Sequence, residues 1–161
     1  MELRTYLSTA PMLPLLPKTP AQAAKALSQI GRWCGRQPYY YSVAQHSVFV
    51  AQHVYRATHN KQLARAAMVH DLCETAIGDL PEPIKNCIEW YQELEEAVDR
   101  AVIGTTCLLI HDGNVVDADT ATKDRERNWI NGNGAPVFVG PHEAKTMWML
   151  AWENYDGQLT W

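Results

Sequence analysis

The sequence predicts an all-α protein, a single helical bundle of about six helices. Two observations carry this prediction: apolar residues recur at helical spacing along the chain, and capping residues precede several of these stretches. The 161 residues suffice for one domain with a substantial core. Because no repeat, linker or low-complexity tract interrupts the chain, we expect residues 1–161 to form that one domain.

Residues that begin and end helices bound the expected elements. Thr19 can cap a helix that starts at Pro20, since proline is favoured at the first helical position. Ser42 and Gln45 form a capping box for the next helix, and Asn114 can cap a later one. The predicted helices cover about residues 20–30, 43–57, 61–77, 89–102, 114–129 and 141–155.

The two ends of the chain carry weaker signals. Residues 1–18 contain three prolines and are expected to form an extended lead-in. Residues 131–161 hold a turn marked by Asn-Gly-Asn-Gly, a short stretch at 137–139 that can be extended, and the last helix. Trp148 and Trp152 form an apolar stripe on that helix, which we interpret first as core and second as a subunit interface.

Composition limits the functional classes. The net charge of −4 argues against a protein that coats nucleic acid, but it allows a phosphorylated small molecule as ligand. No stretch of about 18 apolar residues is present, and no signal peptide is recognisable, so we expect no membrane association. The four cysteines form no CxxC pair, and reduced, buried thiols in a cytoplasmic protein are the expectation.

His70-Asp71 is the first candidate for chemistry. It falls inside the predicted helix 61–77, behind small residues that pack tightly, and a charged group there is rarely buried unless it is paired or binds a metal. Glu74 follows His70 by four residues, on the same helical face, where a carboxylate can hold or protonate a water. A second His-Asp pair, His111-Asp112, falls in a predicted loop and indicates that such a pair can arise by chance.

Further candidate ligands come from the helices on either side. His46 lies on the helix capped by Ser42, and His53 lies seven residues later without any other distinguishing feature. Asp117 and Asp119 compete as the carboxylate from the later helix. Histidine nitrogen and aspartate oxygen together suit zinc, manganese, iron or cobalt.

Taken in order, these segments resemble the HD-domain phosphohydrolases, over about residues 20–130. The resemblance is closest to the bacterial 5′-deoxynucleotidases and to the phage enzymes that hydrolyse dATP to deoxynucleoside and tripolyphosphate. It is carried by Arg32-Trp33, Tyr41 to Ser47, His70-Asp71-x-x-Glu74, Gly78-Asp79-Leu80-Pro81-x-Pro83-x-Lys85, Ala118-Asp119 and Glu126-Arg127.

The resemblance implies a metal site and a catalytic residue. Four ligands, His46, His70, Asp71 and Asp119, would hold one divalent cation, which is zinc, cobalt, manganese or magnesium, and a second cation can accompany the substrate phosphates. Asp119 is preferred over Asp117 because it follows alanine and precedes the Glu-Arg pair. Glu74 would be the catalytic carboxylate.

It also implies the substrate contacts. Arg32 would contact a phosphate, while Trp33 and Asp79 would face the sugar and select against a 2′-hydroxyl. Lys85 can supply another cationic contact, although arginine alone binds phosphate bidentately.

The expected function is therefore hydrolysis of the α-phosphate ester of a 2′-deoxynucleotide, either a monophosphate or a triphosphate, which would adjust the deoxynucleotide pool of a bacterial cell or a phage-infected host. We expect no nucleic-acid partner and a homo-oligomer. One alternative is hydrolysis of the alarmone ppGpp, although relatives with that activity carry Glu-Asp where this chain has Glu74-Thr75. Another is a non-catalytic nucleotide-binding module.

Overall fold

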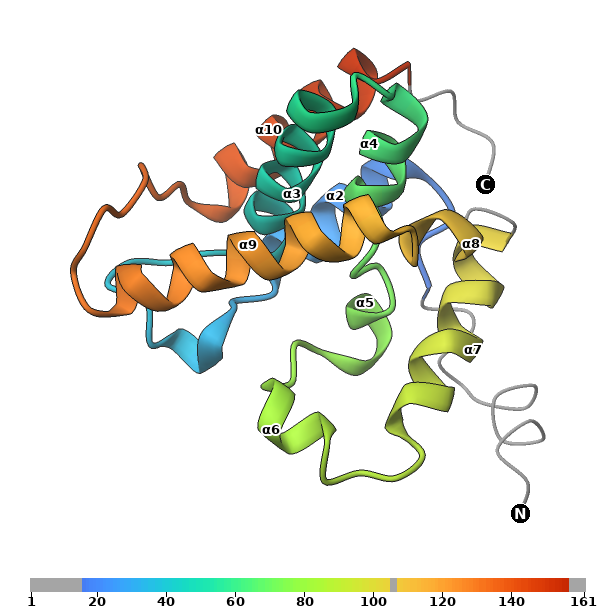
Figure 1. The fold of residues 1–161 in the computed structure, drawn as a ribbon, viewed down its shortest axis with the longest axis horizontal. Helices are drawn as coiled ribbons and strands as arrows, with labels where there is room; N and C mark the ends of the chain where they lie inside the picture. Colours follow the sequence, from blue (N-terminus) through green and yellow to red (C-terminus); the bar gives the residue numbers. More distant parts are fainter. Residues whose placement is uncertain (1–15, 105–106, 157–161) are drawn as a thin grey trace.

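The computed structural model describes residues 16–104 and 107–156, and within these ranges the protein is all-α (Figure 1). The expected lead-in lies almost entirely outside the described residues. Six of the described helices have eight residues or more, which confirms the predicted helical bundle. These are α2 (Pro20–Gln29), α3 (Val43–Thr58), α4 (Lys61–Met68), α7 (Tyr91–Ile103), α9 (Gly113–Ile130) and α10 (Pro141–Asn154).

Shorter helical turns join them: η2 (Trp33–Gly35), α5 (Glu74–Ile77), α6 (Glu82–Lys85) and α8 (Cys107–Ile110). Among the described residues the sole β feature is an isolated bridge between Gly31 and Ser42. This bridge closes the loop that contains η2. The end of α2 and the start of α3 therefore lie close together, with the loop between them.

Two of the three predicted helix caps are confirmed and one is wrong. The side chain of Thr19 accepts a hydrogen bond at the start of α2, and that of Ser42 accepts one from the Gln45 backbone at the start of α3. The cap of α9 is Asp112 and not Asn114: the Asp112 side chain accepts the Asn114 backbone N–H at 2.9 Å, so the helix begins one residue earlier.

The Gln45 side chain does not complete the capping box. It donates to the carbonyl of Val137 at 2.8 Å and accepts from the backbone N–H of Val139 at 3.4 Å. The Gln45 side chain thus bonds to the backbone of residues 137–139 as a neighbouring β-strand would. Residues 137–139 accordingly lie outside any described strand, and the Asn-Gly-Asn-Gly turn joins α9 to α10 without forming a hairpin.

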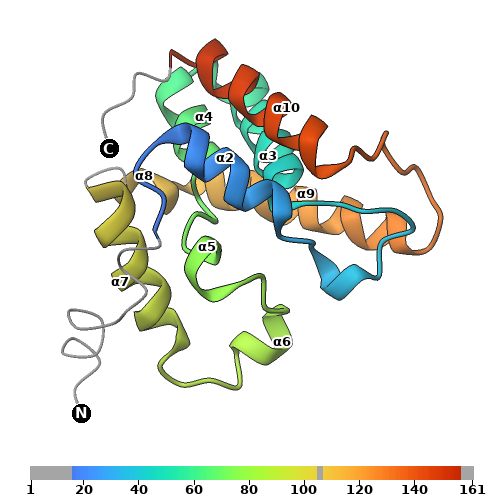
Figure 2. The ribbon, with the colours of Figure 1, turned by 180° about the vertical axis from the view of Figure 1, so that it is seen from behind.

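The core is built around α3, which contacts α2, α4, α9 and α10. Figure 2 shows α10 lying along α2 and α3 on the back of the molecule. Trp148 is fully buried there, its ring stacks on Trp152 at 5.3 Å, and its indole N–H donates to the carbonyl of Met68. The tryptophan stripe of α10 is therefore core, as we interpreted it first.

The prediction of one continuous helix over 61–77 is wrong, because α4 ends at Met68 and α5 begins at Glu74. In a continuing helix the carbonyl of Ala67 would accept from the backbone of Asp71. Here the Nδ1 atom of His70 lies 2.8 Å from that carbonyl, while Trp148 occupies the carbonyl of Met68. Side chains compete for the helical hydrogen bonds, so His70 and Asp71 lie in a turn.

The chain from α5 to α7 forms an arm that curves away below α9 (Figure 1). It returns to the main body through α8, which contacts both α4 and α9. The space between this arm and α9 contains the candidate site described below. In the described ranges, no helix combines the length and apolarity needed to cross a bilayer.

Candidate metal centre and cleft

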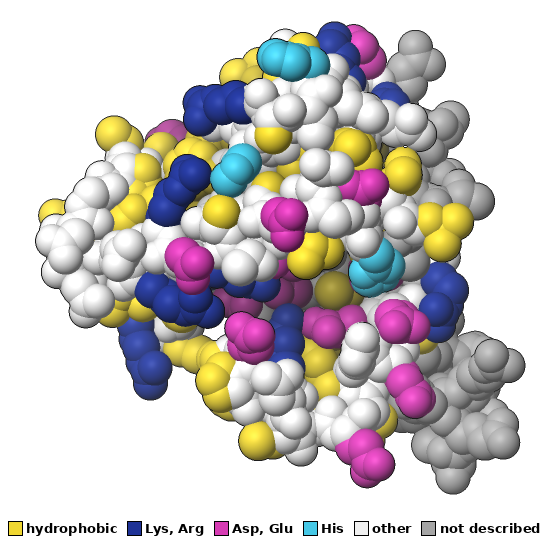
Figure 3. Space-filling view, viewed as in Figure 1, with side chains coloured by type: hydrophobic (Ala, Val, Ile, Leu, Met, Phe, Trp, Pro, Cys, Tyr) yellow, Lys and Arg dark blue, Asp and Glu magenta, His cyan; other side chains and the backbone are white. Residues whose placement is uncertain are grey.

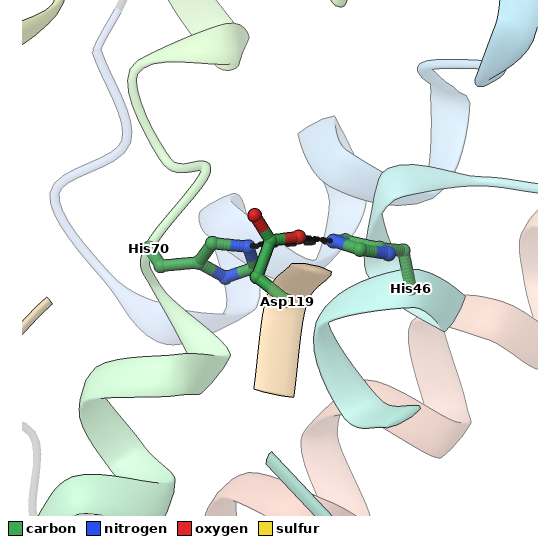
Figure 4. Close-up of side chains that lie close together, drawn as sticks. All are labelled: His46, His70 and Asp119. Atoms are coloured by element: carbon green, nitrogen blue, oxygen red, sulfur yellow. Dashed lines mark hydrogen bonds and ion pairs between the residues drawn. The ribbon is translucent and has the colours of Figure 1, made fainter. Parts of the chain in front are cut away.

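Three side chains from distant parts of the sequence meet at one point (Figure 4). His46 comes from α3, His70 from the turn after α4, and Asp119 from α9. Their ligand atoms all lie within 4.8 Å of one another: the two Nε2 atoms are 3.3 Å apart, and Oδ1 of Asp119 lies 3.1 Å from His46 and 3.6 Å from His70. Such a group can hold a metal ion.

Asp71 contacts the same point. Its Oδ2 lies 3.4 Å from Nε2 of His46 and 3.3 Å from Nε2 of His70, and it also accepts a hydrogen bond from Arg32 at 3.2 Å. A cation with ligand distances of about 2.1 Å separates neighbouring ligand atoms by roughly 3.0–3.4 Å, in octahedral or tetrahedral geometry. Four of the observed spacings, from 3.1 to 3.4 Å, match this range, and the 3.6 Å between Asp119 and His70 is slightly longer. Three of the four predicted ligands, His46, His70 and Asp119, therefore form a group that could hold a divalent cation, and Asp71 lies beside this group without being part of it.

The structure separates the two competing aspartates of α9. Asp117 is exposed, whereas Asp119 is largely buried and points at the histidines. Oδ1 of Asp119 is buried and has no hydrogen-bond partner among the described residues, even though two imidazole nitrogens lie within ion-pair distance. An orphaned buried oxygen is costly. A shared cation would satisfy it together with both nitrogens.

The electrostatics of the centre are those of closely paired charges. Burial opposes the charge of Asp119, but the two histidines outweigh it and hold the pKa of this carboxyl far below its usual range. Burial likewise lowers the pKa of His70, but Asp71 and Asp119 overcome this and raise it to about 9. The centre therefore places the ionised Asp119 carboxylate beside His70, whose Nδ1–H donates to the carbonyl of Ala67.

The centre lies on the wall of a cleft of about 880 Å³ between α9 and the α5–α7 arm. Acidic and basic side chains crowd around this hollow in Figure 3. Every predicted site residue except the fully buried His46 lines it. These lining residues are Arg32, Trp33, His70, Asp71, Glu74, Asp79, Lys85 and Asp119.

Glu74 lies in this cleft and is 3% exposed. Burial raises its pKa well above the ordinary value, and the neighbouring Asp71 carboxylate adds to the effect. Oε1 lies 3.7 Å from the Nζ atom of Lys85, while Oε2 is buried and without a hydrogen-bond partner among the described residues. Lys85 itself lies 2.8 Å from Glu95 on α7. Glu74 thus has one buried oxygen without a hydrogen-bond partner among the described residues and a raised proton affinity.

The loop at residues 32–35 carries the predicted substrate contacts in a strained conformation. Trp33 and Cys34 both have positive φ, 57° and 50°, which is uncommon for residues with a side chain. Two carboxylates hold the tryptophan: Asp79 accepts its backbone N–H at 3.2 Å, and Glu126 accepts its indole N–H at 2.7 Å. Backbone strain of this kind clusters at functional sites.

Glu126 is a residue to which sequence reasoning gave no role. It is fully buried in α9 and accepts hydrogen bonds from Arg32, Trp33, Tyr41 and His46. Burial alone would favour the neutral acid, but His46 and Arg32 keep its pKa well below the usual range. Its spacing of seven residues from Asp119 places both on one helical face, which was the available signal.

Two other charged residues of the cleft were also missed. Lys123 lies one turn after Asp119, and its Nζ is 2.6 Å from Oδ2 of that aspartate. The spacing of four residues predicts such a pair. Asp99 of α7 is 4% exposed, and burial raises its pKa to about 7. Nothing in its sequence neighbourhood marks Asp99, because only the fold brings α7 to the cleft.

The remaining candidates lie outside the centre. Asp112 caps α9, and His111 is exposed at the edge of the cleft. His53 lies on α3, away from the cleft lining. Among the cysteines that are described, Cys34, Cys73 and Cys87 are free thiols, as expected, but the expectation that they are buried holds for Cys73 and is wrong for Cys34 and Cys87, which are exposed.

Comparison with known proteins gives partial similarity. No protein-family model matches the chain. The Escherichia coli K12 protein YfdR is 35% identical over 79 residues, which is 49% of this chain and 42% of that protein. The Rhodobacter capsulatus protein RCAP_rcc00048 is 36% identical over 84 residues, 49% of this chain and 43% of that protein. Both are described as uncharacterized, and the aligned region spans less than half of each relative's length.

Proposed function

We propose that the chain is a metal-dependent phosphohydrolase of the HD-domain type that hydrolyses the α-phosphate ester of 2′-deoxynucleotides. The observation that carries the proposal is the meeting of His46, His70 and Asp119, with Asp71 in contact, at the wall of a cleft that also holds the buried Glu74. A volume of about 880 Å³ is within the usual range for small-molecule sites.

The donor set defines what the site can hold. Two imidazole nitrogens and two carboxylates would bind a zinc-, cobalt- or manganese-like cation. When bound, such a cation lowers the pKa of water and polarises a phosphoryl oxygen. Arg32 lies at the same place, since its Nη1 atom is 3.2 Å from Asp71, and it can add positive charge beside a phosphate.

Glu74 is suited to move the proton that hydrolysis requires. The attacking water gives up a proton, and the sugar oxygen takes one up as its bond to phosphorus breaks. Burial raises the pKa of the Glu74 carboxyl, so it holds its proton to higher pH than an exposed glutamate does and can act as a proton donor or acceptor. Lys85, at 3.7 Å, pairs with one oxygen of Glu74, and the other oxygen is buried without a hydrogen-bond partner among the described residues.

The preference for a deoxynucleotide rests on Trp33 and Asp79. The backbone hydrogen bond between them joins the η2 loop to the segment after α5. Both residues line the cleft, and both are partly buried. An indole in van der Waals contact with C2′ of the sugar leaves no space for a hydroxyl, and a carboxylate can accept from the 3′-hydroxyl.

The test is a substrate screen with product identification. The purified chain is incubated with each dNMP, each dNTP, the matching ribonucleotides and ppGpp, with Mn²⁺, Co²⁺ or Zn²⁺. We expect a deoxynucleoside plus phosphate or tripolyphosphate, no product in EDTA, and ¹⁸O from labelled water in the phosphate product. Turnover of ppGpp alone would replace this proposal with the alarmone alternative, and binding without turnover would favour a non-catalytic module.

A further inference from the structure

The two oxygens of Glu126 serve two different groups. Oε1 lies 2.6 Å from Nδ1 of His46 and accepts from the hydroxyl of Tyr41 at 2.7 Å. Oε2 accepts from the indole N–H of Trp33 at 2.7 Å and from the Arg32 guanidinium at 3.3 and 3.4 Å. One oxygen therefore faces a proposed metal ligand, and the other faces the loop that carries the proposed substrate contacts.

The contact with His46 determines which ring nitrogen is free. A carboxylate at 2.6 Å accepts a hydrogen bond from Nδ1, so the proton lies on Nδ1. The neutral imidazole then presents the lone pair of Nε2, which is the atom that lies 3.1 Å from Asp119 and 3.3 Å from His70. Outer carboxylates of this kind fix the tautomer and the orientation of metal-binding histidines.

The contact with the loop restrains a conformation that is unfavourable on its own. Trp33, Cys34 and Gly35 all have positive φ. Conformations of this kind persist where the surroundings hold them. Oε2 of Glu126 anchors the Trp33 ring from one side, and Arg127 lies over its face at 5.9 Å.

We propose that Glu126 is a positioning residue that couples the two halves of the site: it holds His46 in its metal-binding tautomer and holds Arg32 and Trp33 in place for the substrate. The inference rests on the proposed metal-dependent function. The coupling is geometric, because Oε1 and Oε2 of the same carboxylate accept from His46 and from the η2 loop. A glutamine has one oxygen and one NH₂ group in place of the two carboxylate oxygens. In Glu126→Gln the NH₂ group must therefore face either His46 and Tyr41 or Arg32 and Trp33, all of which are hydrogen-bond donors.

The first measurement is metal affinity without nucleotide, by calorimetry and by the visible absorption of bound Co²⁺. Glu126→Gln should bind Co²⁺ about 10–100-fold more weakly than the wild type, the usual cost of losing an outer partner. Asp117→Asn, which also converts a carboxylate to an amide on α9, should bind as the wild type does. Trp33→Phe, which removes only a donor to Oε2, should keep its metal affinity but raise KM.

The second measurement needs no variant. In the ¹⁵N-labelled, Zn²⁺-loaded wild type, long-range ¹H–¹⁵N spectra should assign the proton of His46 to Nδ1 and the metal to Nε2. Metal bound through Nδ1 would overturn the inference, even if Glu126→Gln does not fold. A folded Glu126→Gln variant with wild-type Co²⁺ affinity would also overturn it. If the wild type binds no metal at all, the proposed function fails, and this inference fails with it.

Discussion

The Nζ atom of Lys123 lies 2.6 Å from Oδ2 of Asp119, one turn earlier on α9. Because this lysine occupies one carboxylate oxygen, the other oxygen, Oδ1, is the one directed at His46 and His70. A helical pair at the spacing of four residues thus orients a group that completes the candidate metal centre. The same α9 face carries Glu126, which contacts His46. One helix therefore supplies the proposed ligand Asp119 and also the carboxylate that holds the proposed ligand His46.

Removing a proposed ligand should abolish metal binding. We expect Asp119→Ala, His70→Ala and Asp71→Ala to lose more affinity than the roughly 10–100-fold that a missing outer partner costs, because a direct ligand is lost. Calorimetric titration with Zn²⁺ or Mn²⁺ measures the effect. Asp117→Ala, two residues away on α9 and exposed, is the matched control and should bind normally. The opposite ranking of the two aspartates would show that the ligand assignment is wrong.

Glu74 should matter for turnover and not for metal binding. Glu74→Gln keeps the size of the side chain but cannot exchange a proton, so kcat should fall by about 10²–10⁴-fold. Metal affinity should stay close to that of the wild type, since the proposed role of Glu74 is to transfer a proton and not to bind the cation. Glu89→Gln, an exposed residue of the same cleft, is the control. Near-normal kcat in Glu74→Gln would remove the catalytic assignment.

The sequence predicted the starts of α2 and α3, where local signals decide them. Thr19 and Ser42 cap α2 and α3 as expected, because each cap needs only residues two or three positions away. The break after Met68 was not predictable in this way. It depends on the His70 ring, which binds the carbonyl of Ala67, and on Trp148, which arrives from a helix 80 residues later.

The candidate site also combines residues that the sequence indicates with residues that only the fold reveals. His46, His70 and Asp119 were predicted as ligands through the order of their motifs, and the fold brings them together in a group that could hold a metal ion. The role of Glu126 requires the fold, because its donors come from α3 and from the η2 loop, about 80 to 94 positions away. Its helical spacing to Asp119 indicates a shared face, but spacing alone does not identify what that face contacts.

Asp99 should make stability depend on pH. Burial raises its folded-state pKa from 3.8 to about 7, so between these values the unfolded chain has lost a proton that the folded chain keeps. Stability due to this group therefore falls as pH rises from about 4 to 7 and is constant above. A rise of this size corresponds to a cost on the order of 4 kcal/mol at pH 8.

Urea unfolding in EDTA, at pH 5 and pH 8, tests this with Asp99→Asn. The variant should lose less free energy of unfolding than the wild type between the two pH values, because it has no proton to lose at this position. Glu93→Gln, an exposed change on the same helix, is the control for the general pH response. Identical pH dependence in Asp99→Asn and the wild type would contradict the raised pKa.

Sugar selection is expected to depend on Trp33. An apolar pocket alone discriminates by about 1–3 kcal/mol, and an additional unpaired polar group extends that range. We expect Trp33→Ala to accept ribonucleotides, so that the ratio of kcat/KM for the deoxy and ribo forms of one nucleotide falls by about 10-fold or more. Overall efficiency should also decline, because the indole hydrogen bond to Glu126 is lost with the ring.

Asp79 separates recognition of the sugar from the chemistry at phosphorus. Its carboxylate accepts the backbone N–H of Trp33 at 3.2 Å, so Asp79→Ala should loosen the loop and remove the acceptor for a 3′-hydroxyl. Hydrolysis of every nucleotide should therefore weaken, whereas hydrolysis of a generic ester such as p-nitrophenyl phosphate should persist, because it needs only the metal centre and Glu74. Comparable losses on both classes of substrate would assign Asp79 to the reaction itself. Equal wild-type rates on deoxyribo- and ribonucleotides would remove the basis for sugar selection altogether, and with it the preference for a deoxynucleotide substrate.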